Sequence, residues 1–344
     1  MQLFFLLRLI VAQLNKQLAN LRIQPLLVNS PGTQTQNIME GLVVKATGSF
    51  YHVKYDDGKI IPCKVRGNMR LQGFEATSPL TVGDHVEIEL IKGDDFGMIV
   101  SIAARKNYII RKSVKLSKQI QVIAANIDRA WVIATPVLPK TSLGFIDRFL
   151  ATAEAYNIPG GIVFNKKDLY DDDLLHYIYE LEKMYESVGY KCKIISSLNE
   201  EDIKMLRLEM KDKVNLFSGH SGVGKTTLIN ALIPGLGLKT SPISAQHSKG
   251  RHTTTFAEMH ELPGGGYIID TPGIREFGTI DFDKYEVSHF FPEIFKTGRN
   301  CRYNNCFHTG EINCAVKDAV RKGDIAMSRY ESYLSILGNE DIFR

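Results

Sequence analysis

Residues 219–226 form a loop whose composition suits it to hold phosphate. The loop follows the pattern G-x-x-x-x-G-K-[ST], directly after the apolar run VNLF and at the start of the helix-like run KTTLINAL. In that context the glycines let backbone N–H groups turn toward phosphate oxygens, and the helix N-terminus adds a positive end. Lys225 would reach the β and γ phosphates, as a catalytic as well as a binding residue, and the Thr226 hydroxyl would ligate Mg²⁺. An ordinary glycine-rich turn is the alternative. We assign nucleotide binding to Gly219, His220, Ser221, Gly222, Val223, Gly224, Lys225, Thr226 and Thr227.

A second motif selects the base of the nucleotide. Asn165, Lys166 and Asp168 belong to the sequence N-K-K-D, which ends the strand-like run GGIVF and matches the N-K-x-D signature of guanine-binding proteins. The Asp168 carboxylate can accept from guanine N1–H and from the 2-amine together, whereas adenine offers neither donor and would leave the acid unpaired. Ser196 and Ser197, after the run KCKII, are placed to brace the base. Alone, N-K-K-D could be a helix-capping loop; beside a phosphate loop it predicts GTP or GDP as the ligand.

The metal and the γ-phosphate require two further segments. Asp270 and Gly273 lie in D-T-P-G after the run GYIID; the aspartate would hold Mg²⁺ through water, and the glycine N–H would sense the γ-phosphate. Residues 249–255, K-G-R-H-T-T-T, form a candidate switch in which we take the Thr254 hydroxyl as the one that closes on Mg²⁺. The base-reading motifs precede the phosphate loop, so the order is permuted. The segment after Asp270 therefore continues into whatever follows residue 280, which could receive its nucleotide-dependent movement.

The elements that must position these motifs alternate between strand and helix. From Asp128 to Gly219, apolar strand-like runs are separated by helix-like runs, which predicts a mostly parallel sheet with helices on both faces and the ligand at the carboxyl ends of the strands. Residues 41–104 instead contain five short β-branched runs broken by turn signals, which predicts an all-β barrel of the OB type. The basic run 105–118 reads as a solvated connector, or as a segment that follows a phosphate backbone.

Near the C-terminus, metal-ligating residues lie close together in the sequence. Cys301, Cys306, His308 and Cys314 supply three thiolates and one imidazole, a set that fits a closed, tetrahedral, structural Zn²⁺ site. Loose buried thiols are the alternative. We predict an extension over 1–38, an OB-type barrel over 39–105, a circularly permuted P-loop domain over 106–280 and a mostly helical zinc-binding domain over 281–344.

Composition sets limits on these assignments. The chain has 344 residues, 44% of them hydrophobic, and a net charge of +4, so it can bury a sizeable core, and net charge alone predicts no nucleic-acid partner. The apolar run 1–14 contains Arg8 and is shorter than a membrane span, and it lacks a convincing secretory pattern. We expect the functional domains to begin near Met39 and the protein to be cytoplasmic, with no membrane association.

Together, the barrel, N-K-K-D, G-H-S-G-V-G-K-T, G-R-H-T-T-T, D-T-P-G and the cysteine–histidine cluster resemble the bacterial ribosome small-subunit-dependent GTPase A family over residues 40–344. The resemblance implies a Mg²⁺-dependent, monomeric GTPase with one structural Zn²⁺. It also implies a role in late maturation of the small (30S) ribosomal subunit, which would stimulate hydrolysis and whose rRNA would contact the barrel and the zinc domain. Position 274 is Ile where many GTPases have a water-orienting Gln, which predicts slow intrinsic hydrolysis. The resemblance makes His252 the candidate that positions the attacking water; a solvent-exposed loop histidine is the alternative.

Two alternatives remain open at this stage. A metabolic P-loop enzyme such as a kinase would share the phosphate loop, although N-K-K-D argues against it. A constitutive rRNA-binding protein with a structural nucleotide site would share every motif but would not turn over GTP, even with ribosomes.

Overall fold

The computed structural model describes residues 38–47, 50–66, 80–91, 93–112, 120–239, 257–270 and 282–338. The described residues belong to one compact unit. The predicted sites His252, Thr254 and Gly273 lie outside the described residues, as does the predicted extension up to residue 37.

The N-terminal part is a small barrel, as the sequence predicted. Its strands are β1 (Ile38–Thr47), β2 (Phe50–Tyr55), β3 (Lys59–Val65), β4 (His85–Leu90) and β5 (Gly97–Ile102). The order is β1-β2-β3-β5-β4, and β4 returns to pair with β1, so the sheet closes on itself. Alternate apolar residues such as Val43, Val53, Ile88 and Ile99 are buried inside it. Pairing with β4 begins at Ile38, opposite Glu89.

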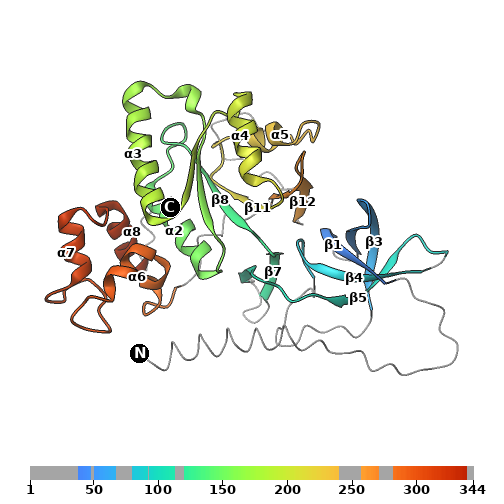
Figure 1. The fold of residues 1–344 in the computed structure, drawn as a ribbon, viewed down its shortest axis with the longest axis horizontal. Coiled ribbons are helices and arrows are strands. Elements are labelled where there is room, and N and C mark those ends of the chain that lie inside the picture. The colour runs from blue at the N-terminus through green and yellow to red at the C-terminus, as the bar shows by residue number, and fades with distance from the viewer. Residues whose placement is uncertain are drawn as a thin grey trace. The chain divides into compact units, whose positions relative to one another are not determined.

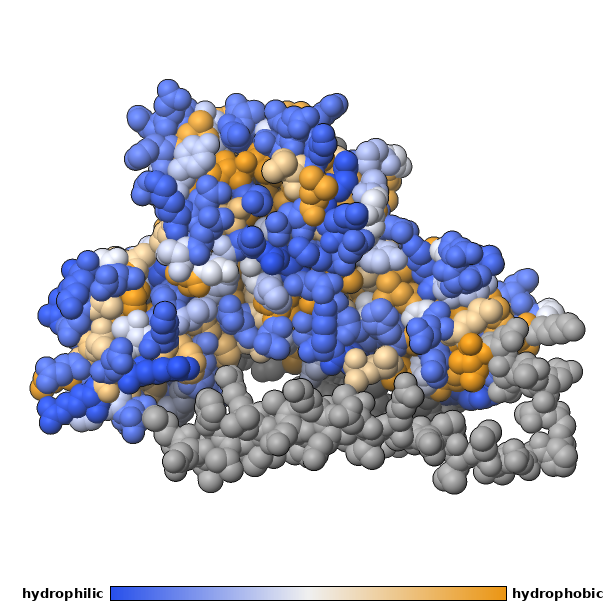
Figure 2. All heavy atoms as spheres, in the orientation of Figure 1, coloured by the Kyte–Doolittle hydropathy of each residue, from blue (hydrophilic) through white to orange (hydrophobic). Residues whose placement is uncertain are grey.

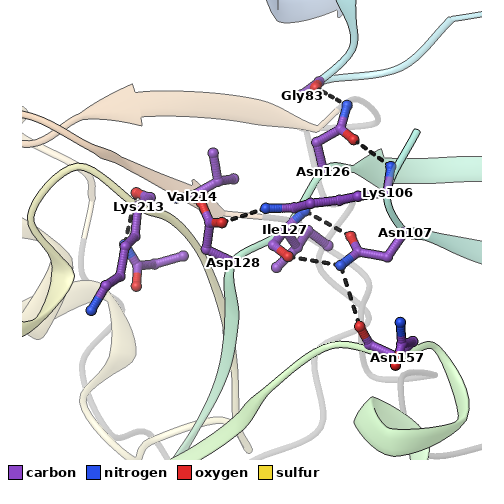
Figure 3. A network of polar contacts seen from close by, with 10 residues as sticks. Gly83, Lys106, Asn107, Asn126, Ile127, Asp128, Asn157, Lys213 and Val214 are labelled. Atoms are coloured by element: carbon purple, nitrogen blue, oxygen red, sulfur yellow. Dashed lines mark hydrogen bonds and ion pairs between the residues drawn. The ribbon is translucent and has the colours of Figure 1, made fainter. Parts of the chain in front are cut away.

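A β-ribbon and a set of buried asparagines follow the barrel. β6 (Tyr108–Lys112) lies within the basic run 105–118 and pairs with β7 (Ile120–Ala125), which follows that run. Asn126 accepts from the Lys106 N–H at 2.9 Å and donates to the Gly83 carbonyl of the barrel at 2.8 Å (Figure 3). Asn107 exchanges hydrogen bonds with the backbone of Ile127 (Figure 3). These side chains satisfy the backbone groups of the junction between the barrel and the next sheet.

The central sheet carries the nucleotide motifs (Figure 1). Its strands are β8 (Arg129–Ala134), β9 (Gly160–Phe164), β10 (Lys191–Ile194), β11 (Val214–Ser218), β12 (Glu258–Glu261) and β13 (Tyr267–Asp270). The order is β10-β9-β8-β11-β13-β12; all neighbours are parallel except β12, which runs antiparallel to β13 and also pairs with β1 of the barrel. The chain reverses its direction of winding between β8 and β11, the place where such sheets bind ligands.

Helices cover both faces of this sheet (Figure 1). One face packs against α2 (Leu143–Ala155) and α3 (Asp172–Val188), the other against α4 (Glu200–Met210) and α5 (Lys225–Leu232). β8 shows why the strand runs are almost entirely apolar: Val132 belongs to the first core, while Trp131 and Ile133 belong to the second.

The C-terminal residues are helical and pack on α2. They form a 3-10 turn (Val287–Phe290) and helices α6 (Pro292–Gly298), α7 (Ala315–Lys322) and α8 (Met327–Leu337). Their core includes Phe291, Ile294, Val316 and Tyr333 and takes in Ala151 of α2. Within the described residues, no helix is long and apolar enough to cross a membrane. Figure 2 shows a face that is mostly hydrophilic, with smaller apolar patches between the polar side chains.

Candidate functional site

The phosphate loop joins β11 to α5 at the carboxyl edge of the parallel sheet. Gly224 ends the loop with φ +87°, and a Cβ there would lie 2.5 Å from Asn165 Nδ2. Both facts require glycine, because an L side chain would be strained and would collide with the neighbouring loop. α5 begins directly at Lys225, so its first backbone N–H groups and the Thr226 hydroxyl lie at the end of the loop. This is an anion-binding geometry.

Lys225 and Asp270 lie side by side beneath this loop. Lys225 Nζ is 3.3 Å from Asp270 Oδ1. The contact lacks hydrogen-bond geometry, so the buried Oδ1 atom has no hydrogen-bond partner among the described residues. A carboxylate and a threonine hydroxyl supply the hard oxygen ligands that Mg²⁺ prefers, and Asp270 Oδ1 accepts no hydrogen bond from the described residues although the Lys225 ammonium lies near it. The residues present therefore fit a nucleotide-bound Mg²⁺, which would neutralise charge on the phosphates when bound.

Asn165 connects the base loop to the phosphate loop. Its side chain is 1% exposed. Nδ2 donates to the Val223 carbonyl at 2.9 Å, and Oδ1 accepts from the Ser197 N–H at 3.1 Å and from Ser197 Oγ at 2.8 Å. Tyr170 also donates its hydroxyl hydrogen to the Asn165 carbonyl. The structure thus brings Asn165 and Ser197 together, and the Asn165 side chain links the N-K-K-D loop to the phosphate loop.

Asp168 is the exposed member of the same motif. Its Oδ1 accepts from Ser196 Oγ at 2.5 Å, and the backbone N–H of Ser196 donates to Asp202 Oδ2 at 2.8 Å. Ser196 is buried and Asp168 is exposed. The serine therefore orients the carboxylate while leaving it accessible to two neighbouring donors, which is the pattern that guanine presents and adenine lacks.

The loop between β8 and α2 completes the rim of the site, and the sequence reasoning did not identify it. Lys166 has φ +68°, and its Nζ donates to the Leu138 carbonyl at 2.6 Å. A Cβ at Gly222 of the phosphate loop would lie 3.4 Å from Pro139 Cδ. One feature of the sequence could have pointed to this loop. It follows β8, the strand beside β11, so it lies at the same edge of the sheet as the phosphate loop.

His220 of the phosphate loop packs on a residue that was also not predicted. Its ring centroid lies 3.8 Å from that of Phe145, in the first turn of α2. Partial desolvation lowers the pKa of His220 below its ordinary value. The contact with Phe145 shows that His220 joins the phosphate loop to α2 by packing.

The cysteine–histidine cluster is assembled in the helical C-terminal residues 282–338, which we call the C-terminal module. The ligand atoms of Cys301, Cys306, His308 and Cys314 all lie within 4.8 Å of one another. Cys301 Sγ is 3.9 Å from Cys314 Sγ, and the two sulfurs lie 3.5 and 3.4 Å from His308 Nδ1. A tetrahedron with Zn–S bonds of about 2.3 Å has S···S edges of about 3.8 Å, so these atoms match a closed zinc site.

The surroundings of the cluster hold its ligands in place. Tyr330 donates to the His308 carbonyl at 2.6 Å, and Tyr333 donates to the Phe307 carbonyl at 2.8 Å. Burial raises the pKa of Cys306 to about 12 when no cation is present. A bound divalent cation would reverse that shift, because thiolates rather than thiols are the ligands. The geometry of the cluster therefore fits a zinc ion, as the spacing of the four residues in the sequence predicted.

Fold and site together define a P-loop GTPase whose strands and motifs occur in circularly permuted order. The family model for the RsgA GTPase matches residues 102–280, and the model for the RsgA N-terminal domain matches residues 40–99. The chain belongs to the RsgA GTPase family and is a GTP hydrolase.

Relatives and solved structures agree with this assignment. The chain is 54% identical over 303 residues to the small ribosomal subunit biogenesis GTPase RsgA of Bacteroides fragilis, covering 88% of this chain and 97% of the relative. It is 48% identical to the protein of the same name from Christiangramia forsetii over 309 residues, covering 89% and 98%. The structure of YjeQ from Thermotoga maritima is 33% identical, with a TM-score of 0.74, and covers 89% of this chain and 100% of that one. YloQ, described as a circularly permuted GTPase, is 28% identical, with a TM-score of 0.71, and covers 90% and 97%.

Proposed function

We propose that this GTPase binds the small ribosomal subunit in its GTP state, hydrolyses GTP in response to that subunit, and leaves in its GDP state during late subunit maturation. The observation that carries the proposal is the near-complete alignment with relatives named small ribosomal subunit biogenesis GTPase, which includes the barrel, the permuted site and the C-terminal module. We also propose that it acts in the cytoplasm and as a monomer.

The site residues have separate proposed roles. Asp168 reads guanine, held by Ser196, and Lys225 with the phosphate-loop N–H groups binds the β and γ phosphates. Thr226, Thr254 and Asp270 would hold Mg²⁺, directly or through water, and the Gly273 N–H would sense the γ-phosphate. His252 would position the attacking water. Hydrolysis would then be slow until a partner brings His252 and the Gly273 N–H to the γ-phosphate.

The barrel and the zinc module are the proposed rRNA contacts. On the barrel, Lys64 Nζ lies over the rings of Phe50 and Phe96, at 5.0 and 4.8 Å. Beside the metal cluster, Arg302 lies over the ring of Tyr303 at 5.6 Å. Cations held against aromatic rings suit contact with phosphates and unstacked bases. The domain limits predicted above, 39–105, 106–280 and 281–344, remain part of this proposal.

Co-sedimentation with ribosomal subunits tests the nucleotide dependence of binding. We expect the protein with a non-hydrolysable GTP analogue to pellet with isolated small subunits about tenfold more tightly than with GDP, and more weakly as salt rises, because phosphate contacts release counterions. Large subunits are the control. Equal binding in both nucleotide states would instead favour a constitutive rRNA-binding protein, and equal binding to both subunits would contradict the proposed partner.

A further inference from the structure

A buried cluster of charges fixes the C-terminal module to helix α2. Arg329 of α8 is 1% exposed, and its Nη1 donates to Asp147 Oδ1 of α2 at 2.9 Å. Its Nε and Nη2 donate to the two carboxylate oxygens of Glu293 on α6, at 2.7 and 3.1 Å. Ser332 donates to Asp147 Oδ2 at 2.6 Å, and Tyr185 of α3 donates to Oδ1 at 2.9 Å. The guanidinium therefore has one carboxylate on the GTPase domain and one on the module.

The surroundings of Arg329 leave this arrangement little freedom. The guanidinium lies over the ring of Phe291 at 4.6 Å, and both Asp147 and Arg329 are almost fully inaccessible to solvent. Removing either charge would leave the other buried without a partner of opposite charge, which is strongly unfavourable. The module therefore cannot slide along α2 without breaking this pair.

The N-terminal turn of α2, close to Asp147, lies against the phosphate loop. Phe145, two positions before Asp147 and in the first turn, packs on His220 of the phosphate loop with ring centroids 3.8 Å apart. The loop that leads into α2 also contacts the base-binding half, because the Leu138 carbonyl accepts from Lys166 Nζ at 2.6 Å. Ser142 caps the helix by accepting from the Phe145 N–H at 3.2 Å. The N-terminal end of α2 thus contacts the phosphate loop, and the loop before it contacts the N-K-K-D loop.

We propose that α2 is a mechanical link between the C-terminal module and the phosphate loop, with Arg329 and Phe145 as positioning residues at its two contacts. Displacement of the module is transmitted through the Arg329–Asp147 pair to α2 and through Phe145 to His220, which changes how firmly the loop holds phosphate. The link rests on the proposed function in one respect, that a partner docks on the module. The contacts themselves belong to the isolated protein and can be tested there.

The rate of dissociation of a fluorescent GDP analogue, measured by stopped flow on the full-length metal-loaded protein, tests the link. We expect Arg329→Met and Phe145→Leu each to accelerate release roughly 3- to 10-fold. Arg321→Met is the matched control, because Arg321 is an exposed arginine on α7 whose ion-pair partner, Asp318, lies on the same helix. It should leave the rate unchanged. The double variant Arg329→Met/Phe145→Leu should release GDP no faster than Phe145→Leu alone, since both residues act through one path.

Two further variants keep the test decisive if Arg329→Met does not fold. Ser332→Ala removes one hydrogen bond to Asp147, and Glu293→Gln removes one charge from the cluster, so both should accelerate release by a smaller factor. Unchanged rates in folded variants, or rate effects of Arg329→Met and Phe145→Leu that simply multiply, would overturn the link. Accelerated, non-additive release in a protein that ignores small ribosomal subunits would uphold the link and refute the proposed partner instead.

Discussion

Replacing Lys225 by alanine should abolish nucleotide binding at micromolar concentrations while leaving the protein folded. Lys225 is the first residue of α5 and lies beside the glycine loop, where its ammonium would contact two phosphates. Charge-assisted hydrogen bonds of this kind are strong, and their loss leaves phosphate oxygens unpaired in the site. We expect the affinity for GDP and GTP to fall by about a hundredfold or more, which corresponds to ~3 kcal/mol. Titration calorimetry measures this directly.

Replacing Lys225 by alanine should change the stability of the protein much less than it changes nucleotide binding. The ion pair of Lys225 with Asp270 joins side chains that are 24% and 22% exposed. Pairs with that access to solvent contribute about 1 kcal/mol at most, so thermal unfolding without nucleotide should barely change. Lys204→Ala, which removes an exposed lysine of α4, is the control and should bind normally. A Lys225→Ala protein whose affinity for GDP falls less than threefold would show that the phosphates bind elsewhere.

Removing the metal should unfold the C-terminal module and leave the nucleotide site largely intact. The cluster organises the helices around it: Cys314 is the N-cap of α7 and accepts from the Lys317 N–H at 3.5 Å, and the tyrosines of α8 bond to the backbone beside His308. Structural zinc sites in small domains supply on the order of 10–16 kcal/mol of apparent binding free energy at neutral pH, which is also folding free energy. We expect one equivalent of zinc per chain.

Hydrogen exchange after chelation provides the readout for this prediction. Amides of residues 301–338 should lose protection, whereas those of β8 and β11 should keep it. Cys301→Ser should reproduce the effect in the presence of zinc. Cys192→Ala is the matched control, because Cys192 is a buried thiol in β10 and not part of the cluster. Retention of full protection at residues 301–338 without metal would mean that the cluster is not what holds the module together.

The sequence was most informative where local pattern and chemistry coincide. The apolar strand runs and the helices between them predicted the parallel sheet, and the phosphate loop appeared between β11 and α5 as expected. The cysteine–histidine spacing likewise brought its ligand atoms together. In each case the residues that determine the structure are neighbours in the sequence or share one element. Their periodicity and spacing are therefore enough to predict that structure.

Contacts between distant elements could not be predicted in the same way. Nothing in the pattern of α8 separates Arg329 from an ordinary surface arginine, because its partners Asp147 and Glu293 lie 182 and 36 residues away. The strand β6 within the basic segment was not predicted, because the charges there gave no strand signal, whereas pairing with β7 provides its backbone hydrogen bonds. The contact of Lys166 with the Leu138 carbonyl depends on how two loops meet, which only the folded sheet determines.

The rate of GTP hydrolysis with and without isolated small ribosomal subunits, at low salt and with large subunits as the control, tests the central claim most directly. We expect slow hydrolysis by the protein alone, stimulation of about tenfold or more by small subunits only, and no competition by ATP, because the proposed site reads guanine and the proposed partner completes the catalytic arrangement. Absence of stimulation, or equal stimulation by both subunits, would contradict the claim that the small subunit controls this GTPase.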